Sequence, residues 1–231
     1  MKPFFKLLSV IALLCISGCN TANLENLTKA SNEIATYCNS QNVRVSTSTG
    51  ISTGDKDMDA YTVEINDLKV VDGYPLSLVA SHAAKILYDR LNDEQRKDKN
   101  IIRVMVSTTS KSETNDYIMA DMARIGSFIK KGRLMVDYIK KADYNSLGKS
   151  LDKKYFTKEN YEAFLEAVLK KNKDILSKTD TIQDDGFETA VIDGKNFINV
   201  YSHTPIDTLN VRYRFTFTDA KPPKLAGIQI K

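Results

Sequence analysis

A few side chains in this 231-residue sequence have the chemistry to bind or react, and they lie far apart along the chain. Cys19 follows two small residues, Ser17 and Gly18, and a cysteine thiol can be alkylated, oxidised or bound to a metal. His203 precedes Asp207 across a Thr-Pro-Ile segment, and a histidine beside a carboxylate can act as a general acid or base. Because that segment is typical of a turn between strands, the sequence favours a surface histidine over an acid–base pair.

The other reactive side chains have structural interpretations that compete with functional ones. His82 lies beside a run of apolar positions, which predicts a residue at the edge of the core whose ring caps it. Cys38 lies on the apolar stripe of a predicted helix, which favours a buried thiol; the alternative is an exposed thiol that pairs with another chain. Asp55, Asp57 and Asp59 alternate as calcium ligands do, but the glycine and glutamate of an EF-hand loop are missing at its sixth and twelfth positions.

Most catalytic and cofactor motifs are missing from the sequence. It contains no glycine-rich nucleotide loop, phosphate loop, His-Glu-x-x-His, Cys-x-x-Cys or Gly-x-Ser-x-Gly motif. With two histidines far apart, a zinc site is not expected either. We therefore expect no catalytic residues, no metal, no cofactor and no enzymatic activity.

The first residues have the composition of an export signal. Lys2 and Lys6 form a short basic segment, and residues 7–16 are apolar except for Ser9. A helix that spans a bilayer needs about 20 apolar residues, so this run is too short to span and is typical of a signal peptide.

The end of that segment resembles the lipobox of bacterial lipoproteins. Ile16, Ser17, Gly18 and Cys19 match it in order: an aliphatic residue, two small residues and a cysteine. The resemblance implies that residues 1–18 are removed, that the Cys19 thiol carries a diacylglyceryl group and that its amine is acylated, for instance with palmitate. Two or three acyl chains anchor a protein stably, and Asn20 in place of aspartate implies the outer membrane, facing the periplasm, if the source is Gram-negative.

Hydrophobic periodicity predicts the elements of the first half, in the order helix, two strands, helix, two strands. After a tether at residues 19–24 we expect an α+β unit of no family that we can name at residues 25–125, with helices packed on an antiparallel sheet. Its polar stretch at 92–100 is expected only to end the second helix. The expected helices are 27–38 and 78–87, and the expected strands are 43–47, 61–65, 101–107 and 117–122.

The second half predicts helices followed by a four-stranded antiparallel meander. A helical face lies at 134–139, a short helix follows Asp143, and Thr157 is a candidate N-cap of a helix whose apolar face runs over 161–169. Asp193-Gly194 predicts a two-residue hairpin turn. Apolar and polar residues then alternate over 209–218, and a last strand is expected at 225–230.

This second half, residues 127–231, resembles the small NTF2-like domains of bacterial lipoproteins. The resemblance is carried by the segment from Arg133 to Tyr144, by 156–170 and by the aromatic-rich strands. It implies a curved antiparallel sheet whose concave face holds the helices around a cone-shaped cavity. The cavity would be lined by Tyr213, Phe215 and Phe217.

The uneven distribution of charged residues suggests a binding partner. Residues 130–178 contain thirteen Lys or Arg against seven Asp or Glu, which indicates either solvated helix faces or a basic surface that contacts anionic lipid or an acidic envelope protein. Nucleic acid is not expected, because export removes the protein from the cytoplasm. We therefore expect a lipid-anchored envelope lipoprotein that acts as a non-catalytic binding or assembly module. The alternatives are a periplasmic small-ligand binder that uses the NTF2-like cavity and, less favoured, an NTF2-like enzyme.

Overall fold

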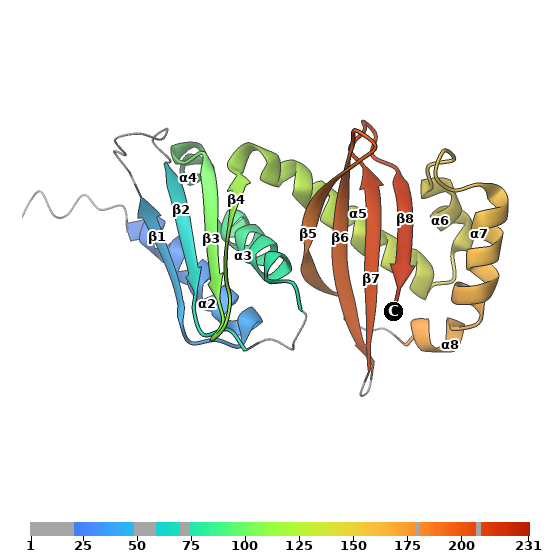
Figure 1. The fold of residues 1–231 in the computed structure, drawn as a ribbon, viewed down its shortest axis with the longest axis horizontal. Helices are drawn as coiled ribbons and strands as arrows, with labels where there is room; N and C mark the ends of the chain where they lie inside the picture. Colours follow the sequence, from blue (N-terminus) through green and yellow to red (C-terminus); the bar gives the residue numbers. More distant parts are fainter. Residues whose placement is uncertain (1–20, 49–58, 70–73, 179–180, 207–208) are drawn as a thin grey trace, which may run out of the picture.

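The computed structural model describes residues 21–48, 59–69, 74–178, 181–206 and 209–231. Within these residues the protein is α+β, with two four-stranded sheets and helices packed against them (Figure 1). This confirms the α+β class predicted from the sequence.

The first sheet contains strands β1 to β4 in chain order. The elements of this half are α2 (Thr21–Cys38), β1 (Val43–Ser48), β2 (Ala60–Ile65), α3 (Leu76–Arg90), α4 (Asp93–Asp98), β3 (Ile101–Ser107) and β4 (Ser112–Ile118). Helix α2 begins at Thr21 and so includes residues that the sequence assigned to a tether. Its apolar stripe is buried at Ala30, Ile34 and Cys38, as the periodicity predicts.

The central strands of this sheet run parallel, which the sequence interpretation missed. β1 pairs antiparallel with β2, and β3 with β4, but β2 and β3 are parallel, with Ala60 opposite Ile101. Helices α3 and α4 connect β2 to β3. They return the chain to the end of the sheet at which β2 begins, as a parallel connection requires. The expectation of a wholly antiparallel sheet is therefore wrong for this pair.

Two boundaries in this half also differ from the predictions. The polar stretch at 92–100 forms α4, because Asn92 accepts a hydrogen bond from the Gln95 N–H while the Gln95 side chain accepts one from the Asn92 N–H. The strand expected at 117–122 is wrong: β4 ends at Ile118 and a helix begins at Met119. Met119 and Met122 lie three residues apart on the buried face of that helix, a spacing that fits a helix and not a strand.

This helix, α5 (Met119–Lys140), begins where β4 ends and extends behind the second sheet (Figure 1). Its buried positions belong to one continuous apolar core that includes residues of both halves of the chain. The division into units at 25–125 and 127–231 stays a prediction, and α5 crosses the place where they would meet.

Short helices follow at the far end of the second sheet (Figure 1). They are α6 (Tyr144–Ser150), α7 (Lys158–Phe164), a π-helical segment η1 (Leu165–Lys170) and α8 (Lys173–Leu176). The N-cap predicted at Thr157 is confirmed, because Thr157 accepts from the Asn160 N–H at 3.2 Å. The short helix expected after Asp143 is also present, and Asp143 is its N-cap, accepting from the Ser146 N–H at 3.1 Å. Of the apolar face expected over 161–169, only Leu169 is fully buried.

The second sheet is the predicted meander. Its strands are β5 (Gln183–Ile192), β6 (Lys195–Ile206), β7 (Leu209–Thr218) and β8 (Leu225–Ile230), each antiparallel to the next. Asp193 and Gly194 both have positive φ, of 50° and 69°, and form the predicted two-residue turn. The sheet is not strongly curled, and the NTF2-like cone is not confirmed.

None of the helices in the described part of the chain is both long enough and apolar enough to cross a membrane.

Candidate functional site

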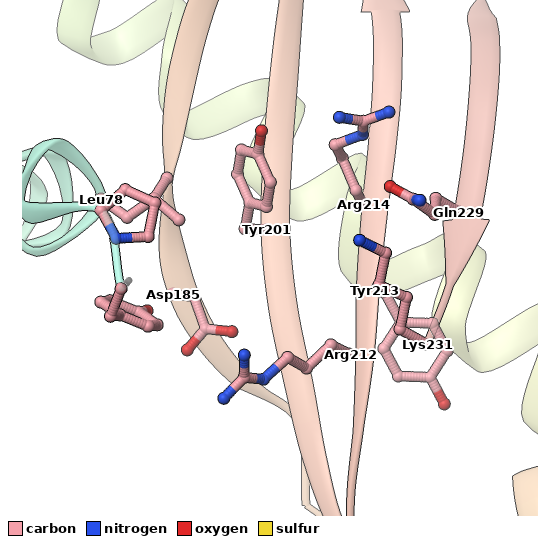
Figure 2. A pocket seen from close by; sticks show the side chains of 10 residues that line it. Leu78, Asp185, Tyr201, Arg212, Tyr213, Arg214, Gln229 and Lys231 are labelled. Atoms are coloured by element: carbon pink, nitrogen blue, oxygen red, sulfur yellow. The ribbon is translucent and has the colours of Figure 1, made fainter. Parts of the chain in front are cut away.

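The second sheet has one face covered by helix and one face open. On the covered face, the ring of Phe128 in α5 lies 5.8 Å from that of Phe217, measured between centroids. A Cβ on Gly132 of α5 would lie 3.1 Å from Val200. Side chains alternate between the two faces of a sheet along each strand. Tyr201 and Arg214 therefore lie on the face opposite to Val200 and Phe217 (Figure 2).

A pocket lies on this open face, where the sheet meets the start of helix α3. It has a volume of about 310 Å³, at the lower end of the range for small-molecule sites. Helix α3 and the residues before it supply one wall, and the strands supply the rest (Figure 2). The residues that line it are Tyr74, Pro75, Leu78, Asp185, Tyr201, Arg212, Tyr213, Arg214, Gln229 and Lys231.

The pocket is rich in positive charge. Arg212, Arg214 and Lys231 line it, against one carboxylate, Asp185. The Arg212 guanidinium lies 5.9 Å from the centroid of the Tyr74 ring, a cation–π distance. Among the residues that the structure describes, no carboxylate forms an ion pair with any of these three cations.

Two tyrosine side chains, Tyr74 and Tyr201, also line the wall. The Tyr201 hydroxyl donates to Glu188 at 2.6 Å, and burial together with this bond raises the pKa of Tyr201 to about 12. Burial likewise raises the pKa of Tyr74 to about 12. Both phenols are therefore neutral near pH 7 and do not reduce the positive charge of the pocket.

A histidine and an aspartate lie together at the edge of this site. His203 Nδ1 lies 2.7 Å from Asp185 Oδ1, and the two side chains are 22% and 13% exposed. The prediction that His203 lies in a surface turn is wrong, because it is part of strand β6 and stands opposite Arg212 of β7. Asp207, its partner in the sequence interpretation, is outside the described residues.

Asp185 reaches His203 because of an irregularity in strand β5. The register shifts between Asp184 and Gly186, so that Asp185 is an extra residue, as in a β-bulge. Its side chain pairs with His203, while Asp184 bonds Arg133 of α5. Sequence reasoning missed this pair, although counting back from the Asp193-Gly194 turn would have paired His203 with Asp184, next to Asp185.

The three aromatic residues expected to line a cone are buried. Tyr213, Phe215 and Phe217 are 2%, 0% and 2% exposed, and they alternate with the arginines that line the pocket. Of the three, only Tyr213 also contributes to the pocket. A cavity-lining role for the set stays a prediction.

The remaining candidate residues have structural surroundings or lie outside the described chain. Cys38 is buried, as the favoured interpretation predicts, and burial raises the pKa of its thiol to about 12. His82 stacks on Tyr37 with 4.0 Å between ring centroids, as expected for a residue that caps the core. Asp59 accepts a hydrogen bond from Lys99 at 3.0 Å.

Several sequence predictions fall outside the described residues. They concern Ile16, Ser17, Gly18, Cys19, Asp55 and Asp57. In the described part of the chain, no three or more His, Cys, Asp or Glu side chains form a group that could hold a metal ion.

Comparison of the chain with protein-family models, with curated proteins and with solved structures finds no match. The function is therefore argued from the residues of the site and from the sequence.

Proposed function

We propose that this protein is a lipid-anchored lipoprotein of the bacterial cell envelope that acts as a non-catalytic binding module. The order of the first 19 residues supports the anchor: a basic start, a short apolar run, then Ile16, Ser17, Gly18 and Cys19. On this proposal the chain is held by lipid on Cys19, at the periplasmic face of the outer membrane if the source is Gram-negative.

The observation that carries the binding function is the pocket on the open face of the second sheet. Its wall combines apolar and aromatic groups from the region of α3 with polar groups from four strands, the combination that is typical of ligand sites. At the edge of the pocket, the bond between His203 and Asp185 orients the Asp185 side chain.

For the second half we also propose an NTF2-like relationship. In support, the helices α5 to α8 precede the meander, and α5 packs on one face of the sheet. A sheet that is not strongly curled does not favour a deep cone, so the binding site that we propose is the pocket on the open face.

The anchor is tested by metabolic labelling with a palmitate analogue in the source bacterium, followed by separation of membranes. We expect label and membrane association in the unaltered protein and in Cys38→Ser, because Cys38 is buried. Cys19→Ser is expected to lose both. Label that persists in Cys19→Ser would contradict the proposal.

The binding function is tested by photo-crosslinking in the envelope. A photoreactive amino acid at Gln229, in the wall of the pocket, is expected to give a defined adduct by mass spectrometry. The same amino acid at Thr114, which is exposed on β4 of the first sheet, serves as the control. Adducts that are equal at both positions, or absent at Gln229, would contradict binding at the pocket.

A further inference from the structure

We infer that the pocket on the open face of the second sheet binds a small organic anion, a phosphate monoester or carboxylate with a short apolar part. This inference rests on the proposed function, since it names the class of ligand for the same pocket. Three features carry it: three cations that line one pocket, nearby carboxylates that are hydrogen-bonded to other side chains, and an apolar wall.

The first feature is that three cationic side chains line one pocket. Arg212 and Arg214 are two residues apart on β7 and both are exposed, so they point from the same face of the sheet. The backbone groups of Lys231 bond those of Arg212 at 2.9 and 3.0 Å. Figure 2 shows the three side chains among the residues that line the pocket, with Arg212 extending toward Asp185.

The second feature is that the nearby carboxylates already have other partners. Asp185 is bonded to His203 at 2.7 Å, and Glu188 accepts from Tyr201 at 2.6 Å. Asp185 keeps its negative charge and offsets one of the three cations. The three cations still outnumber the one acidic side chain that lines the pocket, so positive charge is left for a ligand.

The arginines of this pocket differ from most others in the protein. Five arginines elsewhere form ion pairs with carboxylates: Arg90, Arg96, Arg103, Arg124 and Arg133. In the described residues Arg212 and Arg214 have no such pair. A guanidinium group binds phosphate or carboxylate through two parallel hydrogen bonds, so an anion from solution would supply the missing partner.

The third feature limits the size and shape of the ligand. Tyr74, Pro75 and Leu78 form the wall opposite the cations, and they can cover the hydrocarbon part of a ligand. The volume of about 310 Å³ fits a molecule of roughly the size of a phenyl ring with one charged group and not a folded partner.

The inference is tested by isothermal titration calorimetry of the full chain in mild detergent. The probes are phenyl phosphate and phenol, which share the ring and differ in the anionic group. We expect phenyl phosphate to bind the unaltered protein and phenol to bind at least about tenfold more weakly, because charge contributes most of the affinity. Equal affinity for both probes, or no binding of phenyl phosphate, would overturn the inference.

The site is tested by paired arginine variants. The Arg212→Gln/Arg214→Gln double variant is expected to weaken phenyl phosphate binding at least about tenfold, while Arg44→Gln, an exposed arginine of β1, leaves it unchanged. Lys231→Gln provides a third variant at a position outside any strand. Unchanged affinity in the double variant, with native circular dichroism, would overturn the inference; a pocket adduct at Gln229 would then still support the proposed function.

Discussion

The buried hydroxyl oxygen of Ser81 in helix α3 accepts a hydrogen bond from the backbone N–H of Phe187 in strand β5 at 2.9 Å. The same hydroxyl donates to the Leu78 carbonyl at 3.0 Å. This contact joins the first half of the chain to the edge of the second sheet. It lies beside the bulge that directs Asp185 toward the pocket, so the packing of α3 and the geometry of the pocket depend on each other.

Replacement of Ser81 is expected to destabilise the fold. Ser81→Ala leaves the N–H of Phe187 buried without a partner, which lowers the free energy of unfolding by about 1 to 3 kcal/mol. Urea denaturation measures the change, with Ser177→Ala, at an exposed position of the second half, as the control. A change of less than a few tenths of a kcal/mol in Ser81→Ala would show that this bond does not join the halves.

Replacement of Gly186 tests the close approach of α3 and β5. A Cβ there would lie 2.5 Å from the Leu78 carbonyl oxygen and 2.5 Å from the Ser81 hydroxyl, and its φ of +123° suits glycine only. Gly186→Ala is expected to reduce the free energy of unfolding by at least about 2 kcal/mol. At Gly194 φ is +69° and a Cβ would meet nothing within 4 Å. Gly194→Ala is therefore expected to reduce the free energy of unfolding by only about 1 kcal/mol. Equal losses would contradict the crowding.

The half-buried ring of His82 makes stability depend on pH. Burial lowers the pKa of His82 below its ordinary value of 6.5, although Asp184, Asp185 and Glu33 act in the opposite direction. As the pH falls through 6.5, the unfolded chain therefore binds a proton that the folded protein does not. The free energy of unfolding should fall there, by at most about 1.4 kcal/mol per pH unit from this group.

The measurement compares urea denaturation of the unaltered protein and of His82→Phe at pH 8 and pH 5.5. Phenylalanine keeps a ring that can stack on Tyr37 and does not titrate. We expect the loss of stability between the two pH values to be smaller in His82→Phe. An identical loss would assign the pH dependence to other groups.

The thiol of Cys38 should be unreactive in the folded protein. It is buried, and burial raises its pKa to about 12, so the thiolate that reacts with alkylating reagents is scarce at pH 8. In a chain with Cys15→Ser and Cys19→Ser, Cys38 should be labelled at least about a hundredfold more slowly without urea than in 8 M urea. Similar rates would indicate the exposed thiol of the alternative interpretation.

The bond between the Lys99 ammonium group and Asp59 should stabilise the folded protein. Lys99 is 7% exposed, and its Nζ lies 3.0 Å from Asp59 and 3.6 Å from Asp98. Asp59→Asn replaces a charged acceptor of a nearly buried cation with a neutral one, which is expected to reduce stability by about 1 to 3 kcal/mol. Asp98→Asn is expected to reduce stability by less, because Asp98 lies at the longer distance from Lys99 and is more exposed. The reverse order would make Asp98 the main partner.

Several parts of the fold could be predicted from the sequence because the deciding interactions are local. The caps at Asp143 and Thr157 bond backbone groups three residues away, and the Asp193-Gly194 turn depends on backbone angles that these residue types favour. The alternation over 209–218 also predicted correctly that Tyr213 would be buried. In each case, neighbours in the sequence are neighbours in the structure.

The start of α5 shows where local reasoning failed. Residues 117–122 contain aromatic and apolar side chains that suit either a strand or a helix, and the choice depends on which face is buried by distant elements. The parallel pairing of β2 and β3 has the same origin, because it is fixed by the path of α3 and α4 over the sheet.

The sequence by itself determined the class of fold, most elements and the lipobox pattern at Cys19, because short-range periodicity and motif order carry that information. Only the tertiary structure placed Asp185 beside His203 and gathered Arg212, Arg214 and Lys231 with the wall formed by Tyr74 and Leu78. The physical reason is that the pocket depends on a bulge, a strand register and a helix docked across about 100 residues of chain. Such long-range contacts are fixed when the whole core packs, and no short segment encodes them.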